Sequence, residues 1–241
     1  MARPRLALVH GVGLDHTMWD PVVDRLGSAF ETTAADLLGH GGREAAPAEI
    51  TLRDMAEDLA LRLQPGTHLV GFSLGALVGQ HLARFRPDLV ASLTSVSSVC
   101  RRNDAERAAV EGRLSAAESD FEASVRAALR RWFDDTTVDP ATVKATEATL
   151  LANDRASYVR CYRVFARGDA DIAPELSRIT TPALAITGEL DPGSTPEMSQ
   201  RLAREIPGCH AIVVPGARHM LPVQSPQPFI DALLSFIGGL S

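Results

Sequence analysis

Short apolar runs alternate with longer helical patterns along most of the chain, and this alternation limits the possible folds more than any other feature. The clearest run, Leu6–Val9, has four consecutive apolar residues, as expected of a strand covered on both faces. Strands are predicted at Leu6–Val9, Phe30–Asp36, His68–Val70, Leu93–Val96, Leu184–Thr187 and Ala211–Val214. Helices are predicted at Leu52–Leu63, Leu74–Phe85, Glu197–Glu205 and Phe229–Ile237. This order predicts an α/β fold with a mostly parallel central sheet and helices on both faces.

The stretch from Arg101 to Asp171 breaks the alternation, because it carries helical patterns and no convincing strand. Helices are predicted there at Asp104–Ser119, Ser119–Phe133, Ala141–Asn153 and Arg155–Arg167. Open α/β sheets bind ligands at the carboxyl edge of their strands, so such an insert is most simply a cap over that edge. We therefore predict a core of residues 1–100 and 172–241, with a helical cap of residues 101–171 inserted after the sixth-strand region of the fold.

The composition is that of a globular protein without a broad basic surface. Apolar residues make up 45% of the chain and charged residues 22%, close to the usual balance. Lysine and arginine minus aspartate and glutamate is 24 − 30 = −6, so there is no global field that would attract nucleic acid. The expected partner is a small-molecule substrate, and no nucleic-acid partner is expected.

Cysteine usage and hydropathy favour a cytoplasmic protein. Cys100, Cys161 and Cys209 are an odd number with no CxxC pair, so we expect buried small hydrophobes rather than a disulfide framework. No apolar stretch reaches the roughly 18 residues of a membrane span, and Leu6–Val9 is too short for a signal-peptide core. We expect a monomer or homodimer without a membrane partner. No cluster of His, Asp or Cys shows metal-ligand spacing, so no metal or other cofactor is expected.

The pentapeptide Gly71-Phe72-Ser73-Leu74-Gly75 is the most informative motif of the chain. It follows a short apolar strand and opens the helical run Leu74–Phe85, which is the context that a nucleophile elbow requires. On such a sharp turn the residues two positions either side of the serine must be small, because the backbone is crowded there. The serine hydroxyl then lies at a helix N-terminus, where N–H groups favour developing negative charge. Ser73 is therefore the candidate nucleophile.

A serine nucleophile needs a base and an acid that orients the base, and in this fold they follow the serine in the order acid, then histidine. His219 is the last histidine and lies in the loop after the last predicted strand, whereas His210 begins that strand. Asp191 directly follows the strand Leu184–Thr187, and Pro192 stiffens its turn. We predict His219 as base and Asp191 as acid; the rival acids are Glu189, Asp169 and Asp171.

Two backbone N–H groups are expected to form the oxyanion hole. Leu74 follows the nucleophile and supplies one, and Val12 in His10-Gly11-Val12-Gly13 supplies the other, since that loop follows the first strand. His10 is expected to hold the loop rather than to carry protons. His40 lies in the turn Gly39-His40-Gly41-Gly42 and is not expected to act in catalysis.

Four motifs together resemble the α/β-hydrolase superfamily over nearly the whole chain outside the cap: His-Gly-Val-Gly, Gly-Phe-Ser-Leu-Gly, Gly-Glu-Leu-Asp and Gly-Ala-Arg-His. Within it the chain looks most like the 3-oxoadipate enol-lactonases of aromatic catabolism and their lactonase and esterase relatives. The stretches similar to that group are Gly13–Pro21, Asp36–Gly41, Arg131–Phe133 and Asn153–Leu176.

This resemblance implies a small enol-lactone substrate that bears a carboxylate, with Arg131 and Trp132 as substrate-binding residues. A guanidinium fork suits a carboxylate. At about 100° per residue, Trp132 falls within the apolar stripe of its helix and Arg131 well off it. Trp132 can thus be core or pocket wall, and Arg131 solvated or in the pocket. Arg101, Arg160 and Arg163 are the alternative carboxylate ligands.

The predicted reaction is hydrolysis of an ester or lactone by Ser73, His219 and Asp191. One alternative is a C–C bond hydrolase or lyase-type relative that uses the same triad, because the triad does not encode the bond that is broken. A second alternative, from another class, is a ligand-binding receptor on a hydrolase scaffold. Assays with an enol-lactone, simple esters and vinylogous diketones separate the first two, and tight binding with a single slow turnover marks the receptor.

Overall fold

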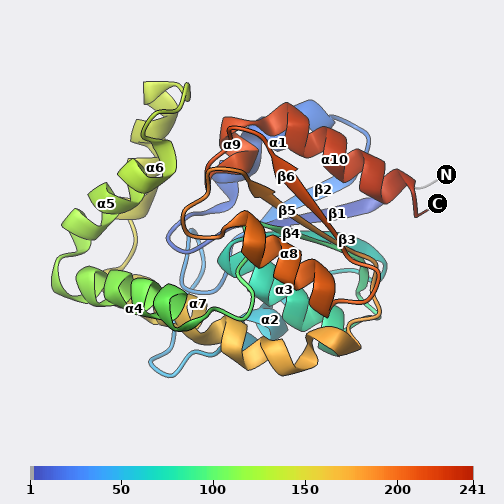
Figure 1. Cartoon of the computed structure of the whole chain (residues 1–241), viewed down its shortest axis with the longest axis horizontal. Helices are drawn as coiled ribbons and strands as arrows, with labels where there is room; N and C mark the ends of the chain where they lie inside the picture. Colours follow the sequence, from blue (N-terminus) through green and yellow to red (C-terminus); the bar gives the residue numbers. More distant parts are fainter. Residues whose placement is uncertain (1–2, 241) are drawn as a thin grey trace.

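Six parallel strands form one central sheet, in the order β2-β1-β3-β4-β5-β6, in the computed structural model, which describes residues 3–240 (Figure 1). The strands are β1 (Arg5–Val9), β2 (Glu31–Ala35), β3 (Thr67–Phe72), β4 (Val90–Val96), β5 (Ala183–Gly188) and β6 (His210–Val214). Each overlaps a predicted strand, so the predicted α/β class is confirmed, and the sheet is fully rather than mostly parallel. The strand order reverses at β1, which lies between β2 and β3. Ligands bind at such a switch point, beyond the carboxyl ends of the strands.

Helices cover both faces of the sheet, with α1 and α10 on one face and α2, α3 and α8 on the other (Figure 1). Their bounds are α1 (Asp20–Leu26), α2 (Leu52–Ala60), α3 (Leu74–Phe85), α8 (Pro196–Glu205), α9 (Leu221–Gln224) and α10 (Pro226–Gly238), with short 3-10 turns at η1 (His16–Trp19) and η2 (Ala173–Arg178). The start of α2 shows why the helix begins there. Thr51 accepts a hydrogen bond from the Asp54 N–H while the Asp54 carboxylate accepts one from the Thr51 N–H, a capping box that satisfies two free donors.

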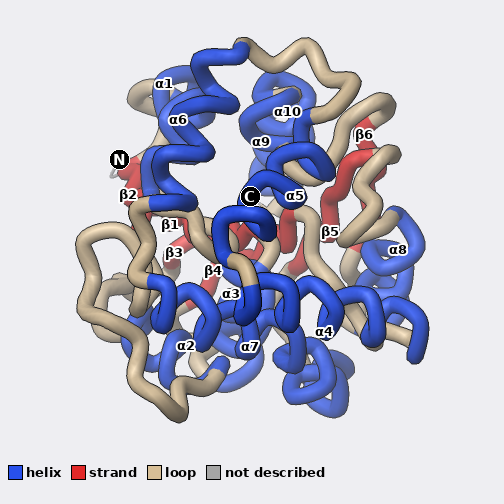
Figure 2. Tube along the Cα trace, turned by 90° about the vertical axis from the view of Figure 1, so that its left-hand side faces the viewer, coloured by secondary structure: helices blue, strands red, loops and turns tan. Residues whose placement is uncertain are grey.

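Four helices lie between β4 and β5: α4 (Asp104–Ser119), α5 (Phe121–Phe133), α6 (Pro140–Leu151) and α7 (Arg155–Ile172). Figure 2 views the molecule from their side and shows α4, α5 and α6 in front of the strands. The N-termini of the four helices are capped by Asn103, Asp120, Asp139 and Asp154. Each side chain accepts a hydrogen bond from a free N–H of the first turn, and this fixes where each helix begins. The division of the chain at residues 101 and 171 remains a prediction.

The place of this insertion in the strand order corrects the prediction. It follows the fourth strand in chain order, not a sixth, because within residues 3–240 two of the six strands come after the helices. The last helix, α7, also runs five residues beyond its predicted end at Arg167. Gly168 lets α7 continue close to α3, since a Cβ there would lie 3.2 Å from Leu77 Cδ1.

A buried ion pair joins α7 to the chain that leaves β4. Arg102 Nη1 lies 2.6 Å from Asp169 Oδ1, with side-chain exposures of only 1% and 3%. The Arg102 N–H donates to the other carboxylate oxygen at 2.8 Å, and the guanidinium lies over the Phe165 ring. Removing one partner of such a pair strands a buried charge, so these contacts tie the beginning of the inserted segment to its end.

Two of the composition-based expectations can be compared with the structure. All three cysteines are free and buried, as predicted. Burial raises the pKa of the Cys100, Cys161 and Cys209 thiols to about 12, so they stay protonated. Across the described part of the chain, no helix is both long and apolar enough to cross a membrane.

Candidate active site

Ser73 lies on the sharp turn between β3 and α3. Its φ of 53° and ψ of −108° are unusual for a residue with a side chain, and such strain is kept where function needs it. A Cβ at Gly71 would collide with the Gly75 carbonyl, and one at Gly75 would lie 2.5 Å from the Val9 carbonyl oxygen. The turn is held from both sides, since Ser73 N–H donates to Val96 O at 2.9 Å and Gly75 N–H to His10 O at 3.1 Å. The two glycines of the motif are therefore required by backbone crowding.

His219 and Asp191 meet although they come from different loops. Asp191 follows β5 and His219 follows β6, and His219 Nδ1 lies 2.7 Å from Asp191 Oδ2. The other oxygen, Asp191 Oδ1, accepts hydrogen bonds from the N–H groups of Gly193 and Ser194, both at 2.9 Å. Both carboxylate oxygens thus accept hydrogen bonds, which fix the orientation of the side chain. With Nδ1–H donated to Asp191, His219 Nε2 is left free to accept a proton.

Ser73, His219 and Asp191 line one cavity of about 570 Å³, a volume that includes its opening to solvent. Within residues 3–240 no hydrogen bond joins Ser73 Oγ to His219, although both residues line the cavity. Such hydrogen bonds are often long without substrate and tighten when it binds. Sequence positions 73, 191 and 219 thus come together as predicted from their places after β3, β5 and β6.

The rival residues lie elsewhere. Glu189 Oε2 accepts the Gly216 N–H at 2.9 Å and so braces the loop that leads to His219. Asp169 is bound to Arg102, and Asp171 and His210 are exposed. None of these four lines the cavity.

The geometry is suited to the predicted oxyanion hole. Val12 lines the cavity from the loop after β1, and Leu74 is the first residue of α3. Among residues 3–240, the N–H groups of both donate no hydrogen bond to another residue. Leu74 itself does not line the cavity, but its N–H directly follows Ser73, which does. Free backbone donors beside a strained serine can bind an oxyanion.

His10 and His40 lie beneath this loop, outside the cavity. His10 is fully buried; its Nδ1 donates to Gly11 O at 2.8 Å and its Nε2 accepts the Leu37 N–H at 3.0 Å. These bonds fix the loop that carries Val12. The His40 ring packs against the His10 ring with centroids 5.0 Å apart. Burial, with a smaller effect of His10, lowers the pKa of His40 to about 3.

Arg131 and Trp132 of α5 both line the cavity, together with Ala128 one turn earlier. The buried residues Val125 and Leu129 lie on the other flank of the helix. The single apolar stripe considered in the sequence did not reveal this second flank, because α5 packs against neighbours on one side and borders the cavity on the other. Burial lowers the pKa of Arg131 from its usual value, although a guanidinium remains charged.

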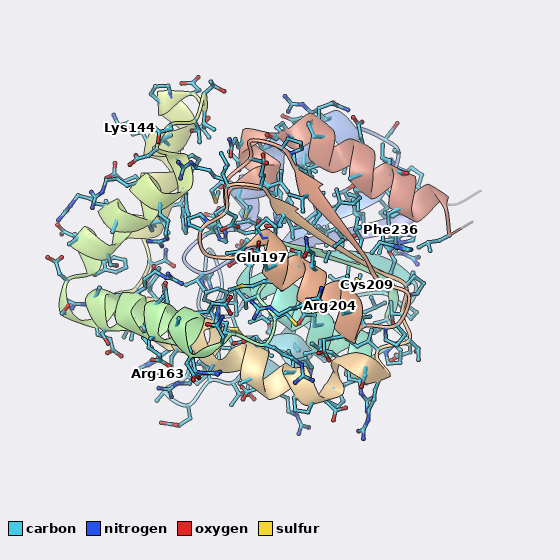
Figure 3. All side chains as sticks on the ribbon, in the orientation of Figure 1. Lys144, Arg163, Glu197, Arg204, Cys209 and Phe236 are labelled. Carbon is cyan, nitrogen blue, oxygen red and sulfur yellow. The ribbon has the colours of Figure 1, made fainter. Side chains whose placement is uncertain are left out.

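The alternative arginines do not reach the cavity. Arg101 pairs with Glu205 at 2.9 Å, and Arg160 donates to the Ala46 carbonyl at 2.7 Å. Arg163 lies on the outside of the helical segment (Figure 3), where it pairs with Glu118.

Sequence reasoning missed one charged residue of the cavity, Arg113 of α4. Its neighbours Val110 and Leu114 are buried, which was the available signal that this side of α4 faces inward. Tyr158, Tyr162 and Phe165 of α7 complete the wall on that side. Among the described residues, no group of three or more His, Cys, Asp or Glu gathers where it could hold a metal ion.

The sequence matches the alpha/beta hydrolase family over residues 6–232. It is 30% identical over 237 residues to an (E)-2-((N-methylformamido)methylene)succinate hydrolase of Acinetobacter baylyi, covering 96% of this chain and 89% of that protein. It is 26% identical to 3-oxoadipate enol-lactonase 1 of the same organism, covering 97% and 88%. Among solved structures, a thermophilic esterase of Thermogutta terrifontis with malate bound superposes with a TM-score of 0.86 at 26% identity, covering 99% and 91%. The resemblance to enol-lactonase-like hydrolases is therefore confirmed.

Proposed function

The chain belongs to the alpha/beta hydrolase family, and on that basis we propose that it is a serine hydrolase that cleaves an ester or lactone bond of a small, carboxylate-bearing substrate. One observation supports this more than any other. The Asp191–His219 hydrogen bond, at 2.7 Å, lies in the wall of the cavity that also holds Ser73 on its strained turn. A hydroxyl, an imidazole and a carboxylate in this arrangement are the parts that nucleophilic acyl transfer requires.

In the proposed mechanism, Ser73 Oγ attacks the substrate carbonyl while His219 Nε2 takes the hydroxyl proton. Asp191 holds the His219 tautomer and stabilises the imidazolium. The N–H groups of Leu74 and Val12 bind the developing oxyanion. His219 then protonates the leaving oxygen and activates a water molecule that releases the acyl group from Ser73. For a lactone the leaving group stays tethered, so the product is a single open-chain acid.

The carboxylate requirement is supported by Arg131 and by the names of the relatives. Arg131 lines the cavity, and within residues 3–240 its only side-chain hydrogen bond is to Ala127 O, on its own helix, at 3.3 Å. A guanidinium with free donors in a cavity suits a planar carboxylate. Two of the relatives act on a succinate derivative and on an enol-lactone of 3-oxoadipate, and the third was solved with malate. All three names point to small carboxylate-bearing compounds.

Ser73→Ala is the direct test. We expect it to lower kcat on p-nitrophenyl acetate and on a carboxylate-bearing enol-lactone by roughly 10⁴-fold or more. Ser115→Ala, on the exposed side of α4, is the matched control and is expected to match the wild type. A serine-reactive phosphonate is expected to label the wild type once, at Ser73. Substantial activity in Ser73→Ala, or labelling at another residue, would overturn the proposed function.

A further inference from the structure

Two arginines from adjacent helices line the cavity above Ser73. Arg131 comes from α5 and Arg113 from α4, and the two helices pack against each other. We propose that the substrate carries two anionic groups, one bound by Arg131 and the other by Arg113. This inference rests on the proposed function of the same cavity and adds a second anion subsite to it.

Neither arginine has an acidic partner. Among residues 3–240, Arg113 and Arg131 take part in no ion pair, although both are at least half-buried. Most other half-buried or buried arginines are paired, among them Arg84 with Glu175 at 2.7 Å, Arg102 with Asp169 at 2.6 Å and Arg201 with Glu106 at 2.6 Å. Arg160, also half-buried, has no acidic partner within residues 3–240 but donates to the Ala46 carbonyl at 2.7 Å. An arginine removed from water is thus usually paired in this protein, and Arg113 and Arg131 are the two without an acidic partner that line the cavity.

The charge of the cavity wall favours anions from outside the chain. Among residues 3–240, Asp191 is the only acidic residue of the wall, and its two oxygens already accept hydrogen bonds from His219, Gly193 and Ser194. The wall therefore has two arginines and a single carboxylate, which is already hydrogen-bonded, so its formal charge is positive. This contrasts with the chain as a whole, whose formal net charge is −6.

The two cations also act on each other. After the larger effect of burial, the Arg113 charge contributes to lowering the pKa of Arg131, and the Asp191 carboxylate opposes this only in part. Like charges in a partly desolvated cavity cost free energy unless counter-charges enter. A single carboxylate can compensate one guanidinium. Two anionic groups on one molecule compensate both, and the Tyr158 and Tyr162 side chains in the same wall add hydroxyl donors.

Binding of simple dicarboxylates to the Ser73→Ala protein tests the second subsite without any turnover. The probes are succinate, glutarate and adipate, compared with butyrate, by titration calorimetry. We expect at least one dicarboxylate to bind about ten- to hundredfold more tightly than butyrate, the gain of a charge-assisted contact. Arg113→Gln and Arg131→Gln, each on the Ser73→Ala background, are expected to reduce that binding to the butyrate level.

Arg107→Gln and Arg130→Gln are the matched controls, since both residues are exposed on the same two helices. They are expected to leave dicarboxylate binding unchanged. Should Arg113→Gln not fold, Arg113→Lys keeps the charge without the fork, and we expect an intermediate loss. Equal binding of butyrate and all three dicarboxylates, or unchanged binding in Arg113→Gln, would overturn the second subsite. That result would leave the proposed hydrolase function standing, whereas residual activity in Ser73→Ala would remove that function without affecting this binding test.

Discussion

The indole of Trp132 stacks on the imidazole of His219, with ring centroids 5.6 Å apart and the planes inclined by 26°. Phe72 lies against the same imidazole, with centroids 5.0 Å apart. Trp132 belongs to α5 and Phe72 to β3, so His219 is held between the inserted helices and the sheet. An aromatic face attracts a cation, and the proposed mechanism makes His219 cationic in its transition state.

Replacing Trp132 is therefore expected to affect the chemical step as well as substrate fit. Trp132→Leu should lower kcat on neutral p-nitrophenyl acetate by about two- to thirtyfold, the size of a lost cation–π contact. Trp132→Phe keeps an aromatic face and should retain most of the wild-type kcat. Steady-state kinetics of the three proteins give the comparison. If both variants keep the wild-type kcat and only KM changes, Trp132 acts only as part of the cavity wall.

Asp191 and Glu189 are two residues apart but are expected to differ strongly in their effect. Asp191→Asn should lower kcat by about 10⁴-fold, because an amide cannot hold His219 with Nδ1 protonated. Glu189→Gln should retain nearly the wild-type kcat, because Glu189 only accepts the Gly216 N–H. Measuring kcat for both variants on one ester decides between them, and the reverse result would reassign the acid.

Gly75 is expected to be intolerant of a single added carbon. Its Cβ would lie 2.5 Å from Val9 O and 2.6 Å from His10 O, both backbone atoms. Gly75→Ala should lower the free energy of unfolding by about 3 kcal/mol or more. Gly112→Ala is the control, since nothing lies within 4 Å of a Cβ there, and in the middle of α4 it should add up to about 1 kcal/mol. Urea denaturation of the three proteins tests this; equal stabilities would contradict the crowding argument.

Because His40 is buried, we expect the protein to lose stability on mild acidification. The pKa of His40 is lowered from 6.5 to about 3 in the folded protein, chiefly by burial. Below about pH 6.5 the unfolded chain binds a proton at His40 that the folded protein does not. The free energy of unfolding therefore decreases as the pH falls, by up to about 1.4 kcal/mol per pH unit from this group.

The measurement is urea denaturation at pH 7.5, 6.5, 5.8 and 5.0, above the range where carboxylates dominate. His40→Asn should have a shallower dependence on pH by about one bound proton, whereas His210→Asn, at an exposed position, should follow the wild type. Parallel curves for the wild type and His40→Asn would refute the assignment.

Much of the fold could be predicted because its signals are local. The helix Leu74–Phe85 has the predicted bounds, since the elbow marks its start and Pro87 follows its end. The helix Asp104–Ser119 also agrees at both ends. The end of α7 was predicted too early, at Arg167, whereas the helix continues through Gly168 to Ile172 where it packs close to α3.

The sequence by itself determined the order of strands and helices and the positions of Ser73, Asp191 and His219 at strand ends, because short-range backbone preferences and chain order govern both. Only the tertiary structure decided which charged side chains share the cavity. Arg113 and Arg131 are separated along the chain and lie at the edges of their helical faces, and Arg163 has the same chemistry but points outward. The role of an arginine side chain depends on the groups around it, and helix packing decides which groups those are.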